Sequence, residues 1–250
     1  MIASLPFWFL ATALAILGAI WGSFVAALCT RWPAGESITN GRSRCDDCGK
    51  AIAVYDLIPL FSYVLLKGKC RHCRAQIGGD AIIIELAALV IGIVAAFLFP
   101  PGQALAAAIF GWLLLPLIIL DIRHLWLPDR LVLTLAVGGI LLGPVLPPDI
   151  ALLDRLFACV GAYGAFEAIR RIYFVVRKRE GMGAGDPKLL AALGIWLGWQ
   201  ALPLVLFLAS GIGLLWALGA KFLTRNDIKA VAFGAVLGLG SLLYIWSRTL

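Results

Sequence analysis

The sequence predicts an all-α, multi-pass membrane protein with about eight transmembrane helices and a small cytoplasmic insert resembling a zinc ribbon. Of its 250 residues, 62% are apolar and only 14% are charged, whereas about a quarter of the residues in soluble domains are charged. The mean hydropathy is +0.97, and a soluble core cannot bury that much hydrocarbon. The net charge of +7 therefore indicates basic loops at a membrane surface, and we expect no nucleic-acid partner.

The expected membrane helices are the apolar segments of the chain. Some are short for a hydrocarbon core of about 30 Å, which predicts that a few helices are partly re-entrant. The first segment has no basic n-region and is longer than a signal peptide requires, so we interpret it as a retained span. The eight segments lie at about 5–29, 81–99, 103–120, 131–146, 150–169, 189–202, 203–220 and 230–247.

The basic residues predict the orientation of these helices. In an eight-span arrangement, 19 of the 21 Lys and Arg residues fall in loops on one side. Arg155 and Arg248 are the two exceptions. Because positive loops stay in the cytoplasm, both termini are expected outside, and acidic lipid headgroups are the expected partners of the basic loops. Those loops are 30–80, 121–130, 170–188 and 221–229.

The predicted domains are a first transmembrane helix at 1–29, a cytoplasmic insert at 30–80 and a transmembrane bundle at 81–250. Two CxxC pairs lie in the insert, and this spacing is typical of a closed, tetrahedral, structural zinc site. Two disulfides or a redox dithiol are the alternative, which a reducing cytosol disfavours. His72 lies within the second pair and is a less favoured ligand. The predicted ligands are Cys45, Cys48, Cys70 and Cys73.

Two acidic residues at the ends of different apolar segments are the candidate catalytic groups. Asp121 directly follows GWLLLPLIIL, and Asp186 ends the glycine-rich stretch GMGAGD. Three glycines, Gly181, Gly183 and Gly185, would give the backbone unusual freedom and let a substrate strand approach. The stretch has neither the GxGxxG spacing of a dinucleotide loop nor the GK[ST] ending of a P-loop. For either acid alone, a carboxylate solvated at the membrane interface is the simpler alternative.

Two carboxyl groups that meet at a low-dielectric border would share a proton and could perform acid–base catalysis. The sequence does not establish that Asp121 and Asp186 meet. With only two histidines in the chain and no HExxH, a serine triad or a zinc protease site is not favoured. A proton-coupled transporter and a non-enzymatic assembly protein remain as alternatives, although transporter acids usually lie near the membrane midplane.

These motifs resemble those of the type IV prepilin peptidases, the GxGD-type aspartic peptidases of bacterial membranes. GMGAGDPKLLAALGIWLGW resembles the second catalytic motif and LIILDIRHLWLPDRL the first. GSFVAALCTRWP, the two CxxC pairs and Glu85 resemble the N-terminal region. The resemblance implies that Asp121 and Asp186 are the catalytic pair and that the protein lies in the inner membrane with its active site facing the cytoplasm.

The resemblance also implies the substrates and a second activity. The enzyme would remove the basic leader from type IV prepilins or type II secretion pseudopilins, and many family members methylate the new N-terminus using S-adenosylmethionine. Glu85 would serve methyl transfer or structure. The family often has Asn where this chain has Ala26 and Leu57, and Arg-Tyr-Pro at 80–82. These differences keep a peptidase without methyltransferase activity as an alternative. No oligomeric state is predicted.

Overall fold

The computed structural model describes most of the chain in two compact units, Met1–Ala108 and Ile109–Leu250. The predicted segment limits at residues 5 and 230, and the predicted basic loop beyond residue 224, lie outside the described residues. The division into domains at 1–29, 30–80 and 81–250 stays a prediction. The described residues are 6–37, 44–45, 47–146, 149–224 and 232–248.

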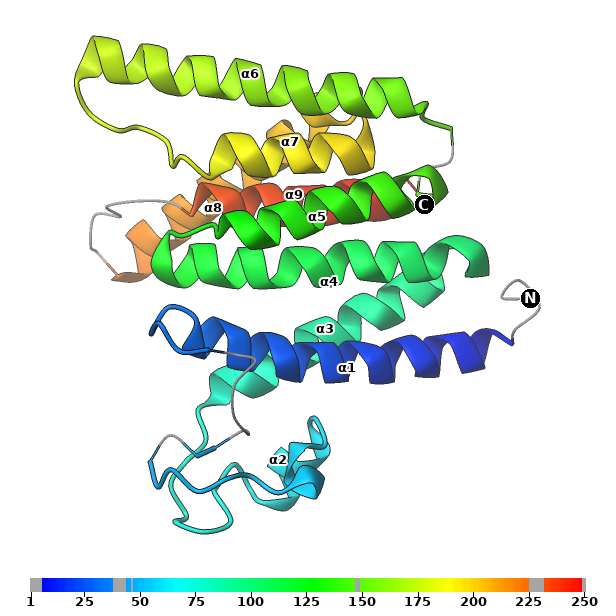
Figure 1. The fold of residues 1–250 in the computed structure, drawn as a ribbon, viewed down its shortest axis with the longest axis vertical. Helices are drawn as coiled ribbons and strands as arrows, with labels where there is room; N and C mark the ends of the chain where they lie inside the picture. The colour runs from blue at the N-terminus through cyan, green and yellow to red at the C-terminus, as the bar shows by residue number, and fades with distance from the viewer. Residues whose placement is uncertain (1–5, 38–43, 46, 147–148, 225–231, 249–250) are drawn as a thin grey trace. The chain divides into compact units, whose positions relative to one another are not determined.

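The predicted all-α class is confirmed. Eight long helices coincide with the eight predicted apolar segments, and the described residues contain isolated β-bridges but no strand (Figure 1). Short helices η2 (Val54–Leu57), α2 (Phe61–Leu65) and η3 (Gly143–Val145) complete the fold. The long helices are α1 (Phe7–Arg31), α3 (Gly79–Leu98), α4 (Pro101–His124), α5 (Asp129–Leu142), α6 (Leu152–Arg177), α7 (Asp186–Leu197), α8 (Leu202–Thr224) and α9 (Phe233–Ser247).

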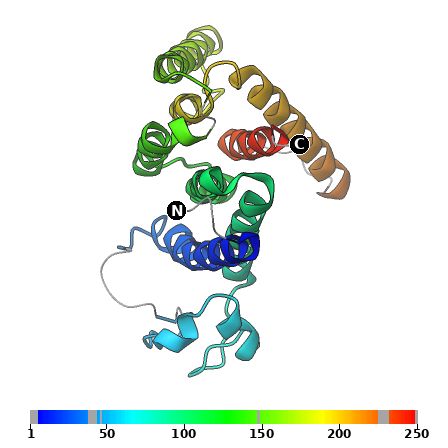
Figure 2. The ribbon, with the colours of Figure 1, turned by 90° about the vertical axis from the view of Figure 1, so that its right-hand side faces the viewer.

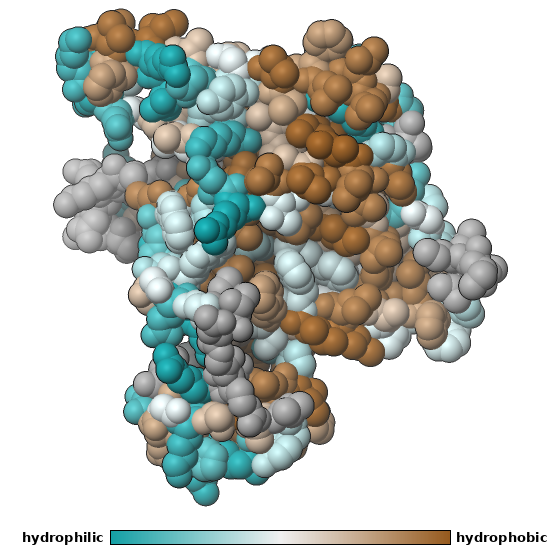
Figure 3. Space-filling view, viewed as in Figure 1, coloured by the Kyte–Doolittle hydropathy of each residue, from teal (hydrophilic) through white to brown (hydrophobic). Residues whose placement is uncertain are grey.

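Four of these helices are long and apolar enough to cross a membrane, namely α1, α3, α4 and residues 202–222 of α8. Helix α9 is apolar but shorter, and α7 has only 12 residues, about 18 Å at 1.5 Å per residue. Polar side chains gather over the insert and over one end of unit 2, while apolar side chains cover the helices (Figure 3). The protein is therefore a multi-pass membrane protein, and a full crossing by the four other long helices stays a prediction.

Unit 1 is built on the close packing of α1 against α3. The α1 sequence GAIWG places Gly18 and Gly22 one turn apart on the contact face. A Cβ atom at Gly22 would lie 2.6 Å from the Cα atom of Glu85, and one at Gly18 would overlap the carbonyl of Ala88. Small residues spaced in this way let two membrane helices approach until their backbones touch.

Unit 2 places α7 between α5 and α6, with α9 on a further side (Figures 1 and 2). Every residue from Asp186 to Leu197 is buried except Lys188, whereas only 11% of the apolar window of α8 is buried. Trp196, which is fully buried, packs on Phe110 with ring centroids 5.0 Å apart. Its indole Nε1 also donates to the Leu135 carbonyl at 2.7 Å. Helix α7 is thus an internal helix of this unit, and most of α8 is left to face lipid.

The two exceptions to the basic-loop pattern both have partners at the far end of unit 2. Arg155 has no exposed surface, and its guanidinium donates to the carbonyls of Ile195 and Trp196 at the C-terminus of α7. Arg248 pairs with Asp149 at 3.5 Å. A cation that caps a helix C-terminus satisfies otherwise unpaired carbonyls and complements the helix dipole. Arg155 is therefore a structural part of the bundle, which its charge alone did not indicate.

Candidate active site and cysteine cluster

Asp121 lies in the last turn of α4 and is 5% exposed. Its Oδ2 accepts a hydrogen bond from the backbone N–H of Ala235 at 2.7 Å. Ala235 is the third residue of α9, where backbone N–H groups have no partner within the helix. A residue 114 positions away therefore fixes this carboxyl group, and this contact was not predicted from the sequence.

Asp186 is the first residue of α7 and is also 5% exposed. Its Oδ2 accepts a hydrogen bond from the backbone N–H of Gly183 at 3.1 Å. Pro187 follows within the first turn, where the missing N–H of proline costs no helical hydrogen bond. The start of a helix favours a negative charge because the helix dipole is positive there.

The two carboxyl groups line one cleft within unit 2. The cleft has a volume of about 870 Å³. Lys188 and Asp129 also line it and form an ion pair at 2.6 Å, so Lys188 is paired rather than free to act as a base. The other lining residues are Leu125, Trp126, Leu127, Glu180, Gly181, Met182, Gly183, Ala184, Gly185 and Phe233.

The three glycines before Asp186 line the cleft but do not use left-handed backbone conformations, because none of them has a positive φ. The neighbouring side chains explain them instead. A Cβ atom at Gly181 would overlap the ring of Tyr173, and one at Gly185 would lie 2.7 Å from the Cβ atom of Leu127. The expected freedom of the backbone is therefore absent here, and close approach of a substrate strand stays a prediction.

The four cysteines of the insert form a cluster that could bind a metal ion. Their sulfur atoms all lie within 4.8 Å of one another. Within the described residues, this is the one group of three or more possible metal ligands. All four cysteines are free thiols. The sulfur atoms of Cys45 and Cys73 are 3.8 Å apart, far longer than a disulfide bond of about 2.05 Å.

Local hydrogen bonds build the cluster from two similar knuckles. The N–H of Cys45 donates to the Lys50 carbonyl, and the N–H of Cys70 donates to the Ala75 carbonyl. In the second knuckle, the backbone N–H groups of Cys73 and then His72 lower the pKa of the Cys70 thiol to about 7. The backbone N–H of Ala75 lowers the pKa of the Cys73 thiol, but burial and the neighbouring cysteine sulfurs outweigh it and raise that pKa to about 12. The four sulfur atoms by themselves are a donor set that suits a divalent cation.

The rest of the insert is held by an ion pair beside the second knuckle. Arg71 donates to both carboxylate oxygens of Asp56, at 2.9 and 2.7 Å. Its guanidinium also lies over the ring of Tyr55, 5.3 Å from the centroid. The hydrogen bond from Arg71 keeps the pKa of Asp56 below its usual value. This pair joins the segment between the knuckles to the second knuckle.

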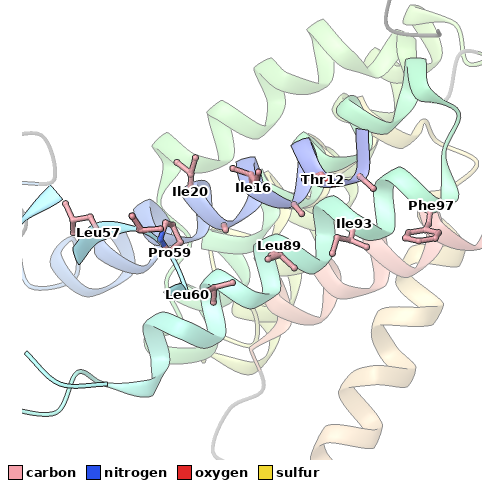
Figure 4. A pocket seen from close by; sticks show the side chains of 13 residues that line it. Thr12, Ile16, Ile20, Leu57, Pro59, Leu60, Leu89, Ile93 and Phe97 are labelled. Carbon is pink, nitrogen blue, oxygen red and sulfur yellow. The ribbon is translucent and has the colours of Figure 1, made fainter. Parts of the chain in front are cut away.

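Glu85 joins the insert to the membrane helices of unit 1. It is 9% exposed, and its Oε2 accepts the backbone N–H of Leu60 at 2.8 Å. Leu60 has a φ of 62°, which is an unfavourable conformation for a bulky residue. The segment 57–60 closes one end of an apolar groove of about 760 Å³ between α1 and α3 (Figure 4). The observed contact is structural, and a part of Glu85 in methyl transfer stays a prediction.

Comparison with known proteins identifies the family of the chain. A protein of Aeromonas salmonicida (strain A449) named "Prepilin leader peptidase/N-methyltransferase" is 36% identical over 212 residues, which is 84% of this chain and 72% of that protein. A protein of the same name from Pectobacterium carotovorum subsp. carotovorum is 35% identical over an alignment that covers 94% of this chain and 92% of that protein. The model of the Type IV leader peptidase family matches residues 108–218. The chain belongs to the type IV leader peptidase family.

The matches to this leader peptidase family cover both units. The model of the Bacterial Peptidase A24 N-terminal domain matches residues 16–99, which include the cysteine cluster and Glu85. The leader peptidase match contains Asp121 and Asp186. A further relative from Escherichia coli O78:H11 (strain H10407 / ETEC), named "Type 4 prepilin-like proteins leader peptide-processing enzyme", is 33% identical over 86% of this chain and 78% of its own. No solved structure matches the chain.

Proposed function

We propose that this protein is an aspartic endopeptidase that removes the basic leader from type IV prepilins or type II secretion pseudopilins. One observation carries the proposal: Asp121 and Asp186 are each 5% exposed and line the same cleft of about 870 Å³. Family membership and the names of the relatives agree with this activity. The simpler alternative is that each acid is a solvated carboxylate at the membrane interface. It does not account for two buried acids that line one cleft.

In the proposed mechanism, Asp121 and Asp186 hold one proton between them, because two close carboxylates in a poorly hydrated site cannot both ionise cheaply. The ionised carboxylate accepts a proton from the attacking water, and the protonated one donates a hydrogen bond to the scissile carbonyl. The backbone donors Ala235 and Gly183 each occupy one oxygen of their carboxyl group. The other oxygens remain for the water and the substrate.

The proposed site faces the cytoplasm of a bacterial inner membrane. The C-termini of α4 and α6 and the N-termini of α5 and α7 lie at one end of unit 2 (Figure 1). Basic residues gather at the same helix ends: Arg123 and Arg130 near Asp121, and Lys188 near Asp186. Because basic loops stay on the cytoplasmic side, a prepilin would be cut where its hydrophobic helix emerges from the bilayer.

The proposed metal of the cysteine cluster is a structural Zn²⁺. Cys45, Cys48, Cys70 and Cys73 supply four sulfur ligands, the number that fills a tetrahedral zinc site and leaves no position for water or substrate. Such an ion would stabilise the fold of the insert and take no part in peptide hydrolysis. The Asp121 and Asp186 pair would supply the chemistry alone.

The test is cleavage of a purified prepilin by the full-length protein in detergent or liposomes. Asp121→Asn and Asp186→Asn should each reduce cleavage by more than about 10³-fold, because neither variant can hold the shared proton. Asp154→Asn is the control, since Asp154 is an exposed acid at the start of α6, outside the lining of the cleft. Normal cleavage by either cleft variant, with the control equally active, would overturn the proposal.

The same assay tests the second activity in the relatives' printed name, N-methylation. Mass measurement of the product N-terminus after addition of S-adenosylmethionine gives the answer directly. A product without the methyl group would favour the peptidase-only alternative. Proton flux through liposomes that contain the wild-type protein, without cleavage of any prepilin, would instead favour the transporter alternative.

A further inference from the structure

Leu127 lies in the short link between α4 and α5, six positions after Asp121. Its side chain is 9% exposed and lines the cleft. It contacts two glycines from separate parts of unit 2. A Cβ atom at Gly185 would lie 2.7 Å from the Cβ atom of Leu127, and one at Gly234 would lie 2.7 Å from its Cδ1 atom. Both glycines are therefore packed directly against this one side chain.

Each of these glycines directly precedes either a cleft acid or the residue that holds one. Gly185 directly precedes Asp186. Gly234 directly precedes Ala235, whose N–H holds the Oδ2 of Asp121, and that oxygen would lie 3.0 Å from a Cβ atom at Gly234. One apolar side chain thus touches the backbone supports of both acids. Leu127 is also joined by a short stretch of chain to Asp121 itself.

We propose that Leu127 is a positioning residue that sets the separation of Asp121 and Asp186. The inference rests on the proposed peptidase function, because a shared proton requires the two carboxyl groups at a fixed separation. Close packing allows little adjustment, and a misplacement of about 1 Å can cost about a hundredfold in rate. Leu127 touches neither the proton nor the water, so its effect acts through the two glycine contacts.

The first test compares Leu127→Ala with Leu146→Ala. Leu146 is equally apolar and 1% exposed, and it follows η3 at the opposite end of unit 2. Both changes leave a cavity and should lower thermal stability. Leu127→Ala should also lower kcat by about 10- to 100-fold with KM changed less than about threefold. Leu146→Ala should keep kcat within about twofold of the wild type. The milder Leu127→Val serves if the alanine variant does not fold.

The second test uses the different atoms that the two glycines meet. Gly234→Ala would clash with Cδ1 of Leu127, an atom that Leu127→Ala removes, and would also crowd Oδ2 of Asp121, which that change leaves in place. Gly185→Ala would clash with Cβ of Leu127, which alanine retains. Leu127→Ala combined with Gly234→Ala should therefore recover part of the kcat that Gly234→Ala alone loses. Leu127→Ala combined with Gly185→Ala should recover none of the kcat that Gly185→Ala alone loses.

A third measurement does not depend on the proposed function. In the double variant Asp121→Cys/Asp186→Cys, a short bifunctional thiol reagent can cross-link the two introduced cysteines, and peptide mass analysis identifies this cross-link. Adding Leu127→Ala should reduce the yield of the cross-link severalfold, whereas adding Leu146→Ala should not. If the wild type cuts no prepilin, the proposed function fails and this yield still decides the inference. Equal yields, equal kcat losses in Leu127→Ala and Leu146→Ala, or rescue of both glycine variants would overturn it.

Discussion

The cysteine insert and the aspartate cleft bring their functional side chains together in different ways. In the insert, each pair of ligands lies within one turn of chain, and each knuckle is closed by a hydrogen bond between residues five apart, as from Cys45 to Lys50. In the cleft, the two acids are 65 positions apart. Asp121 is held by Ala235, 114 positions away.

The two sites therefore obtain their stability from different sources. A knuckle needs few residues, and the remaining free energy would come from the metal, since small metal sites gain most of their folding energy on binding. The cleft has no such ion in its proposed chemistry. Its geometry depends on the packing of α4, α5, α7 and α9, including the burial of nearly all of α7. Three predictions can break or sharpen this contrast.

The largest effect is expected when a cysteine of the cluster is removed. Cys45→Ser should reduce bound zinc from about one ion per chain to almost none, because a three-sulfur site loses much of an affinity worth roughly 10 kcal/mol or more. Limited proteolysis should then cut the insert. Cleavage of prepilin should persist within about tenfold, because the closed metal site supplies no group to the reaction.

The control for this change is Cys159→Ser, since Cys159 lies on α6 outside the cluster. It should retain zinc and an intact insert. Elemental analysis of the purified proteins under reducing conditions measures the metal. Wild type without zinc would remove the basis of the contrast, as would a Cys45→Ser protein that loses all cleavage while its helices remain folded.

A smaller effect is expected at the far end of α7, which unit 2 holds by packing and hydrogen bonds. Arg155→Met should destabilise the protein by about 2–3 kcal/mol, because buried carbonyls at the end of α7 lose a charged donor. Arg248→Met, which removes an exposed ion pair, should cost less than about 1 kcal/mol. Thermal unfolding in detergent, followed by tryptophan fluorescence, compares the two variants. Equal losses of stability would contradict the assignment of Arg155 as a helix cap.

The smallest effect is expected within the knuckles. Gly49 and Arg74 occupy the same position in the two knuckles, four residues after the first cysteine, with φ values of 68° and 62°. Gly49→Ala should weaken the first knuckle by about 1 kcal/mol, because alanine resists a left-handed conformation. Arg74→Gly should strengthen the second by about 0.5 kcal/mol. Titration with a chelator measures both, and faster metal loss from Arg74→Gly would show that the arginine side chain has a role of its own.

The sequence by itself determined the class of fold and the parts that depend on neighbouring residues. Hydropathy located all eight long helices, because a helix that crosses a bilayer needs a continuous apolar run, and neighbouring residues alone show such a run. The CxxC spacing located the four sulfurs for the same reason. Asp121 and Asp186 stood out because the first directly follows an apolar run and the second lies between a glycine-rich stretch and the next apolar run.

Only the tertiary structure decided which distant groups meet. It placed both acids in one cleft, gave Asp121 the Ala235 donor, and set Leu127 between Gly185 and Gly234. It also gave the glycines before Asp186 a packing role in place of the expected backbone freedom. These contacts join segments tens of residues apart, and no local pattern encodes them. They follow from how apolar helix faces and close-packed side chains fit together.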